Sequence, residues 1–164
     1  MNKKGFTLIE LLIVVAIMAI LAVIVFTALD PLRRFRDSRD SVRWQQVSEL
    51  LNAIKLDQVD HGGAYLPSIA SMGTSTGIYM IGTDVSGCNN FNDNCTTGVS
   101  GSTACINISN LVNRGYLSTI PTSPNGNGTW IAGHTGYTLQ VGDTGAVFIR
   151  ACENENSPEI MLSR

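Results

Sequence analysis

The sequence has little of what an enzyme or a nucleic-acid-binding protein requires. Its 164 residues include two histidines, and neither belongs to a recognisable set of acid, base and nucleophile. The net charge is −2, so there is no basic excess for general nucleic-acid binding. Neither a glycine-rich phosphate loop nor a CxxC pair typical of zinc sites is present. We therefore expect a protein that is not an enzyme, with no cofactor, no metal and no specific nucleic-acid partner.

Charge is also missing from one long apolar run. From Phe6 to Leu29 the chain has 24 residues, and the only ionisable side chain among them is Glu10. As a helix rising ~1.5 Å per residue, this run is ~36 Å long and can cross a bilayer. A carboxylate inside such a span costs roughly 2.5–3.5 kcal/mol, so we expect Glu10 to have a partner. The run is too long for a secretory signal peptide, and no small-residue cleavage site follows it.

A short basic segment precedes the run, and residues 3–10 read KKGFTLIE. This motif resembles the cleavage site of a type IV prepilin, a class that also includes the pseudopilins of type II secretion. The resemblance implies that a prepilin peptidase cuts between Gly5 and Phe6, and that the new N-terminus on Phe6 is methylated. It also implies that Glu10 helps subunits to assemble. The likeness covers about residues 1–30 and extends, through a long N-terminal helix, to about residue 60.

The chemistry of these residues agrees with the resemblance. Cleavage would create a positive α-amine on Phe6, and Glu10 lies four residues later, on the same face of a helix. A carboxylate near a helix N-terminus is also favoured by the helix dipole. We therefore expect Glu10 to form an assembly salt bridge with the Phe6 amine of its own chain or of a neighbouring subunit. The alternative is an ordinary signal anchor, which explains neither the Gly-Phe junction nor the position of the glutamate.

The sequence predicts a leader at residues 1–5, a transmembrane and assembly helix at 6–30, an amphipathic helix at 31–62 and a β-rich head at 63–164. The amphipathic pattern, with spacing i, i+3, i+4, i+7, is carried by Val47, Leu50, Leu51 and Ile54.

The two helical segments are expected to be nearly continuous. Pro31 removes a backbone donor between them, so we predict a helix break there, as a kink or an unwound stretch within residues 26–32.

The head is rich in glycine, serine, threonine and asparagine, which favours strands with long loops. Strands are predicted at 78–81, 137–141 and 146–151, with residues 142–145 as a hairpin turn. Residues 86–103 are expected to form a polar surface loop, and residues 107–114 a short helix closed by Gly115. The predicted fold class is α+β: a type IV pilin-like fold, in which a long N-terminal helix packs against a small antiparallel sheet.

The chain has four cysteines, Cys88, Cys95, Cys105 and Cys152, which allow three disulfide pairings. We prefer Cys88–Cys95, which would close a short polar loop, together with Cys105–Cys152, which would tether the C-terminal strand. Cys95–Cys105 with Cys88–Cys152 is the next choice. Each disulfide would contribute roughly 2–4 kcal/mol without requiring a large core.

A second, looser resemblance lies in the head. Residues 115–121 (GYLSTIP) and 136–139 (GYTL) are similar to the loop-then-strand passage of many bacterial pilins and major pseudopilins. In some pseudopilins the following loop binds calcium. Here Ser123 stands where an acidic residue is frequent, and no carboxylate follows before Asp143. Because calcium usually takes carboxylate ligands, we expect no calcium site.

The resemblance implies a single-pass precursor in the inner membrane, with its N-terminus in the cytoplasm. It then implies an extracellular helical filament of identical subunits, built by an assembly platform and a motor ATPase. The five arginines between residues 33 and 43 oppose this orientation by a count of basic residues. We keep the orientation because disulfides form outside the cytoplasm. The arginines are also interleaved with Asp30, Asp37 and Asp40, so we expect them to form surface ion pairs along the helix. The alternatives are a pseudopilin acting as a periplasmic piston and a monomeric membrane-anchored binding protein.

Overall fold

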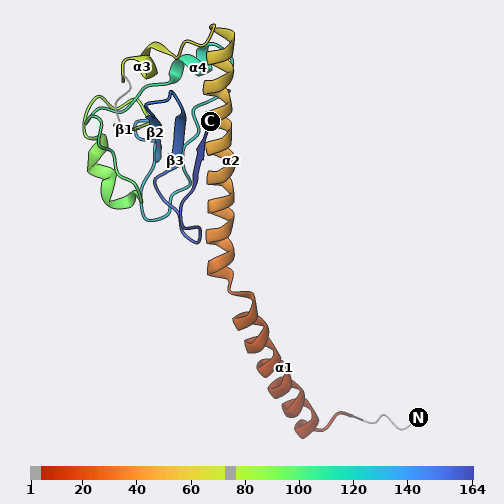
Figure 1. Cartoon of the computed structure of the whole chain (residues 1–164). Coiled ribbons are helices and arrows are strands. Elements are labelled where there is room, and N and C mark those ends of the chain that lie inside the picture. The colour runs from red at the N-terminus through yellow and green to blue at the C-terminus, as the bar shows by residue number, and fades with distance from the viewer. Residues whose placement is uncertain (1–4, 73–76) are drawn as a thin grey trace. The chain divides into compact units, whose positions relative to one another are not determined.

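The computed structural model describes residues 5–72 and 77–164 (Figure 1). Two compact units meet in the sequence between Phe35 and Arg36. The first unit contains the apolar helix and the second contains the head. Together they confirm the predicted α+β class, in which a long N-terminal helical region precedes a small antiparallel sheet.

The apolar run forms helix α1, Leu8–Leu29. Every residue of α1 is exposed within the chain, although the helix is apolar on all sides. A helix that is hydrophobic all round is normally buried, either in a protein core or in a membrane. The N-terminal helical region is long and apolar enough to cross a membrane.

Asp30 follows the last residue of α1 as its C-cap and has a left-handed conformation with φ 35° and ψ 71°. Helix α2, Pro31–Asp60, begins at the next residue. Proline is well suited to the first position of a helix, since its missing N–H would have no helical partner there. The interruption expected within residues 26–32 therefore falls on Asp30, and Pro31 starts the second helix.

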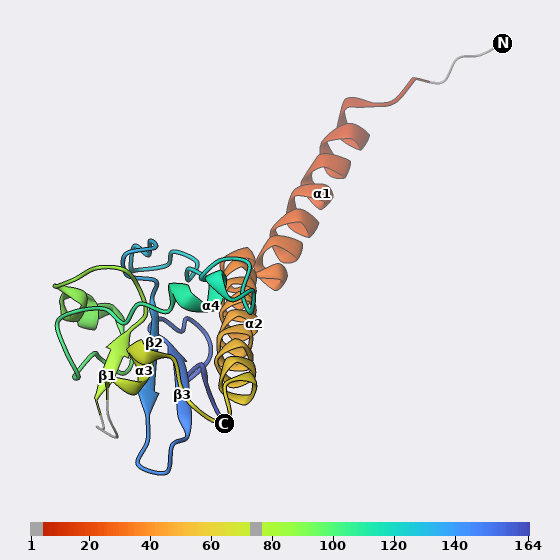
Figure 2. The same cartoon turned by 90° about the horizontal axis from the view of Figure 1, so that it is seen from above.

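Residues 36–60 of α2 run along one face of the sheet (Figures 1 and 2). The predicted apolar stripe is buried there, and Val47 and Leu50 are completely inaccessible to solvent. Their partners in the core include Leu139 and Ile149 from the sheet and Leu111 from a short helix. Burying an aliphatic side chain of this size contributes roughly 1.5–3 kcal/mol, so the stripe fixes α2 to the head.

The sheet has four antiparallel strands in the order β1-β2-β3-β4. Their bounds are β1 Ile78–Met80, β2 Tyr137–Val141, β3 Val147–Ala151 and β4 Met161–Ser163. In the central pair, Leu139 lies opposite Ile149, and Ile149 lies opposite Leu162 of β4. The first three strands agree with the prediction to within one residue. The sequence did not predict β4, because three residues are too few to show an alternating pattern.

The remaining elements are short helices. Helix α4, Ser109–Asn113, lies within the predicted helical range, and Gly115 follows it with a φ of 83° that suits a glycine. Helix α3, Pro67–Ala70, was not predicted. The expected surface loop at residues 86–103 contains the 3₁₀ helix η1, Cys88–Asn94.

The preferred disulfide pairing is wrong, and so is the second choice. Cys88 pairs with Cys105, and Cys95 pairs with Cys152, with Cα–Cα distances of 5.5 and 3.9 Å. The reason is helix η1, which separates Cys88 from Cys95 by roughly 14 Å at ~2 Å per residue. That distance is too large for a disulfide, because two cysteines whose Cα atoms lie more than about 7 Å apart cannot be bridged. The Cys95–Cys152 bridge instead ties the loop to the residue directly after β3.

Candidate functional site

The predicted cleavage junction lies in non-helical backbone just before α1. The Phe6 side chain is 86% exposed, and a Cβ atom added at Gly5 would meet nothing within 4 Å. A peptidase that binds an extended peptide can therefore reach this junction. Lys3 and Lys4, which belong to the same motif, lie outside the described residues.

Glu10 is part of a capping box with Thr7, the residue that caps the N-terminus of α1. The Thr7 backbone N–H donates to Glu10 Oε2 at 2.9 Å, and the Thr7 hydroxyl donates to the same oxygen at 3.0 Å. In return, the Glu10 N–H donates to Thr7 Oγ1 at 3.3 Å. The carboxylate is therefore held at the N-terminal end of the helix, where the helix dipole favours a negative charge.

Sequence reasoning identified Glu10 but overlooked Thr7. The signal was present, because Thr-x-x-Glu before an apolar run is the signature of a capping box. In the full-length chain the Phe6 nitrogen belongs to a peptide bond, so it carries no positive charge. The salt bridge between Glu10 and a Phe6 amine therefore stays a prediction for the cleaved chain.

A second group of charges lies inside the head, around Arg43. This arginine is completely buried and forms ion pairs with Asp40 at 2.8 Å, Glu155 at 2.9 Å and Glu153 at 3.0 Å. Its remaining hydrogen bonds go to oxygen atoms of Ser123 and Pro124. The guanidinium thus joins α2 to two loops distant in sequence, residues 123–128 and residues 153–157.

The side chain of Asp40 binds the backbone of the C-terminal loop, residues 155–157. The carboxylate accepts hydrogen bonds from the N–H groups of Glu155, Asn156 and Ser157. Burial alone would raise the pKa of Asp40, but these N–H donors and Arg43 outweigh it, and the net pKa lies below the ordinary value. For Glu155, hydrogen bonding to Arg39 is the main cause of a lowered pKa; burial opposes it and Arg43 adds to it.

These lowered pKa values predict acid sensitivity. A carboxyl with a lower pKa in the folded chain stabilises the fold above its unfolded pKa, about 4, and loses that contribution as the pH falls through the folded value. The free energy of unfolding should therefore be nearly level above about pH 5 and fall below about pH 4. Denaturant titrations across this range test the expectation. The Asp40→Asn variant should show a shallower fall, whereas Asp93→Asn, at an exposed position, should follow the wild type.

Sequence reasoning treated the arginines after the apolar run as surface charges, which is wrong for Arg43. Helical spacing contained the relevant signal. Arg43 precedes Val47 by four residues and Leu50 by seven, so it lies on the buried face of α2. Arg39 is partly exposed and pairs with Glu155.

The loop after Ser123, where we expect no calcium site, is held by a carboxylate of the Arg43 cluster. Glu153 reaches the loop from after β3, accepting from the Gly128 N–H and from Trp130 Nε1. Its carboxylate is also paired with Arg43, as described above. Among the residues that the structure describes, no three histidine, cysteine, aspartate or glutamate side chains are grouped so that they could hold a metal ion.

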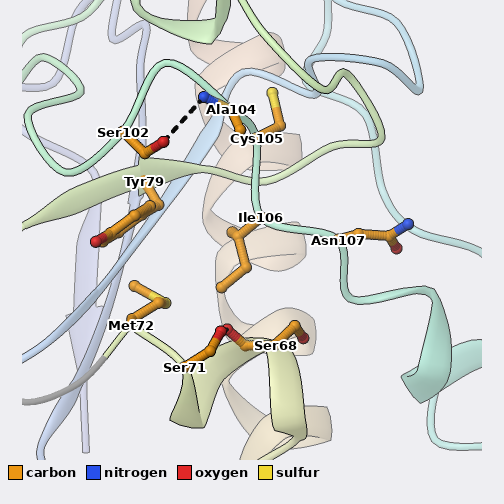
Figure 3. A pocket seen from close by; sticks show the side chains of 9 residues that line it. All are labelled: Ser68, Ser71, Met72, Tyr79, Ser102, Ala104, Cys105, Ile106 and Asn107. Carbon is orange, nitrogen blue, oxygen red and sulfur yellow. Dashed lines mark hydrogen bonds between the residues drawn. The ribbon is translucent and has the colours of Figure 1, made fainter.

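The head also has an open cavity of about 200 Å³ between α3, β1 and the segment after Ser102 (Figure 3). Its apolar surface comes from the ring of Tyr79 and the side chains of Met72 and Ile106. Hydroxyl groups come from Ser71 and Ser102. None of the lining residues that the structure describes carries a charge.

Residues 1–26 match the family model described as the prokaryotic N-terminal methylation motif. The chain matches no curated protein and no solved structure. The matched residues include the junction, Thr7, Glu10 and most of α1. The chain thus carries the N-terminal motif of a type IV pilin- or pseudopilin-like prepilin, a substrate type of the prepilin peptidase.

Proposed function

We propose that the protein is a structural subunit of a type IV pilus-like filament. Prepilin peptidase removes residues 1–5 and the new N-terminus on Phe6 is methylated. The N-terminal helices then pack in the centre of a helical polymer, and the heads form its surface. The observation that carries the proposal is the arrangement at the start of α1: an accessible Gly5–Phe6 junction, a carboxylate one turn later and a fully exposed apolar helix.

The charge on Glu10 gives such a polymer its register. Moving α1 from lipid to the filament centre exchanges one apolar environment for another, so burial of its aliphatic side chains contributes little to assembly. A carboxylate in those surroundings gains from meeting a cation, and an isolated charge there is costly. The α-amine that cleavage creates on a neighbouring Phe6 supplies this cation. The pairing requires one axial stagger between adjacent helices, and that stagger sets the helical symmetry.

The capping box prepares Glu10 for this role. Thr7 occupies one carboxylate oxygen, Oε2, with two hydrogen bonds. A carboxylate has two oxygens and about four acceptor sites, so Oε1 can still accept from an ammonium group. Before a neighbour arrives, Thr7 partly satisfies the charge within the lone subunit. This arrangement supports a stable pool of subunits in the inner membrane.

The disulfides of the head support the proposal that it lies outside the cytoplasm. Its two disulfides form in oxidising compartments such as the periplasm. The sequence has no nucleotide-binding loop, so extension requires a separate motor ATPase and an assembly platform. In this proposal the precursor has its N-terminus in the cytoplasm, and the mature subunit ends in an extracellular fibre.

Processing at Gly5 tests the first step. Co-expression with a prepilin peptidase should convert the wild type to a chain that begins at Phe6, seen as a faster-migrating band. Gly5→Leu should stay full-length, because a large side chain replaces the residue at the cleaved bond. The conservative control Leu8→Ile should be cleaved like the wild type. Equal cleavage of Gly5→Leu and wild type would show that the junction lies elsewhere.

The location of the polymer separates the proposed pilus from the alternatives. Fibres sheared from the cell surface should contain the protein if it is a pilin. A pseudopilin would instead form a periplasmic piston, and a monomeric anchored binding protein would stay in the membrane fraction.

A further inference from the structure

We propose that residues 31–35, here called the boundary segment, bind the phosphate headgroups of anionic phospholipids on the outer face of the membrane. The inference rests on the proposed function in one respect only, that α1 spans the membrane. It assigns a partner to side chains that neither the cleavage motif nor the core of the head uses.

The boundary segment closely follows the helix that spans the membrane. The 22 residues of α1 give a helix ~33 Å long, close to the ~30 Å thickness of a hydrocarbon core. Residues directly after Asp30 therefore enter the headgroup layer when α1 spans the bilayer. That layer adds roughly 5–7 Å on each side, and five helical residues rise ~7.5 Å. The boundary segment thus lies almost entirely within it.

The boundary segment combines exposed apolar side chains with two arginines. Leu32 and Phe35 are three residues apart in α2, so they lie on one side of the helix. Their side chains are 68% and 63% exposed. Arg33 and Arg34 lie between them in the sequence and are also exposed. A helical segment that combines an apolar side with arginines and an aromatic ring is typical of the membrane interface.

Arg33 and Arg34 differ in exposure from the arginines of α2 that serve the head. Arg39 and Arg43 pair with Glu155 and the neighbouring carboxylates. Arg33 and Arg34 are exposed, as is Arg36 just beyond the boundary segment. When α1 spans the bilayer, the boundary segment places Arg33 and Arg34 at the level that lipid phosphates occupy.

Arginine matches this partner chemically. Its planar guanidinium donates two parallel hydrogen bonds to phosphate oxygens, which a lysine ammonium cannot do. Phe35 and Leu32 place apolar surface at the boundary with the acyl chains. The arginines thus act as a lipid anchor on the outer side, which accounts for basic residues on the side where a count of charges would not place them.

The test measures which lipids stay bound to the full-length protein. Detergent micelles containing equal amounts of phosphatidylglycerol and phosphatidylcholine are mixed with the protein, and lipid adducts are counted by native mass spectrometry. Two arginines at ~1 kcal/mol each predict a preference of roughly 30-fold for phosphatidylglycerol. The Arg33→Gln/Arg34→Gln variant should lose it. The Arg33→Lys/Arg34→Lys variant should keep a smaller preference, and Arg164→Gln, on the head, should match the wild type.

Two results would overturn the proposal. One is an equal preference in the wild type and the double glutamine variant. The other is displacement of phosphatidylglycerol by short duplex DNA through the same two arginines, which would assign the segment to nucleic acid. Neither result depends on filament formation. A chain that fails to assemble but keeps its lipid preference would contradict the proposed function and leave the lipid site intact.

Discussion

Replacing Glu10 with alanine is expected to abolish filament assembly and to leave the protein in the membrane. Insertion should persist, because removing the carboxylate takes away a cost of roughly 2.5–3.5 kcal/mol. Assembly should fail because each subunit loses its ion pair with a neighbouring α-amine. Such a pair contributes about 4 kcal/mol at a separation of ~4 Å and an effective dielectric constant of about 20. We expect the fibre yield, measured by immunoblotting of the sheared fraction, to fall at least about 100-fold.

Two matched variants separate the ion pair from the helix cap. Glu10→Gln keeps an oxygen that can accept from Thr7 but removes the charge, and it should be nearly as defective as Glu10→Ala. Thr7→Val removes the hydroxyl contact but keeps Glu10, at a cost of about 1 kcal/mol for the cap, and it should still assemble. Wild-type fibre yield from Glu10→Gln would mean that the charge has no role in assembly.

Replacing Arg43 with methionine is expected to destabilise the head by about 3–5 kcal/mol. The substitution leaves Asp40, Glu153 and Glu155 buried or partly buried without their shared cation, and removing one partner of a buried ion pair has a cost of this size. Single domains are stable by about 5–15 kcal/mol, so much of the stability would be lost. Denaturant unfolding followed by tryptophan fluorescence measures the change, since Trp130 is buried against Glu153.

Arg39 provides the matched control. It also pairs with Glu155, but its side chain is 35% exposed, so Arg39→Met should cost less than about 1 kcal/mol. A combined Arg43→Met, Glu153→Gln and Glu155→Gln variant should recover part of the lost stability, because the uncompensated negative charges are removed with the arginine. Equal losses in Arg39→Met and Arg43→Met would contradict the central position of Arg43.

Local features of this fold could be predicted from the sequence. The span of α1 follows from an uninterrupted apolar run, and the break before α2 follows from Pro31, since both depend on neighbouring residues alone. The pairing of β2 with β3 is equally local, because a short turn rich in glycine, residues 142–146, sets two apolar strands side by side.

Features that depend on distant contacts could not be predicted. The disulfides depend on the 3₁₀ helix η1, which holds Cys88 and Cys95 apart, and nothing in the polar composition of that loop indicates it. The role of Arg43 depends on carboxylates more than 100 positions later in the chain. Charge alone suggested a surface residue, and only helical spacing placed it on the buried face. Strand β4 depends on pairing with β3, which three residues cannot reveal by themselves.

The most direct measurement is the intact mass of the subunit recovered from sheared surface fibres. We expect the mass of residues 6–164 with both disulfides formed and one added methyl group on Phe6. A subunit that retains Met1, or a protein found only as single chains in the membrane, would contradict a polymer built through a trimmed N-terminal helix.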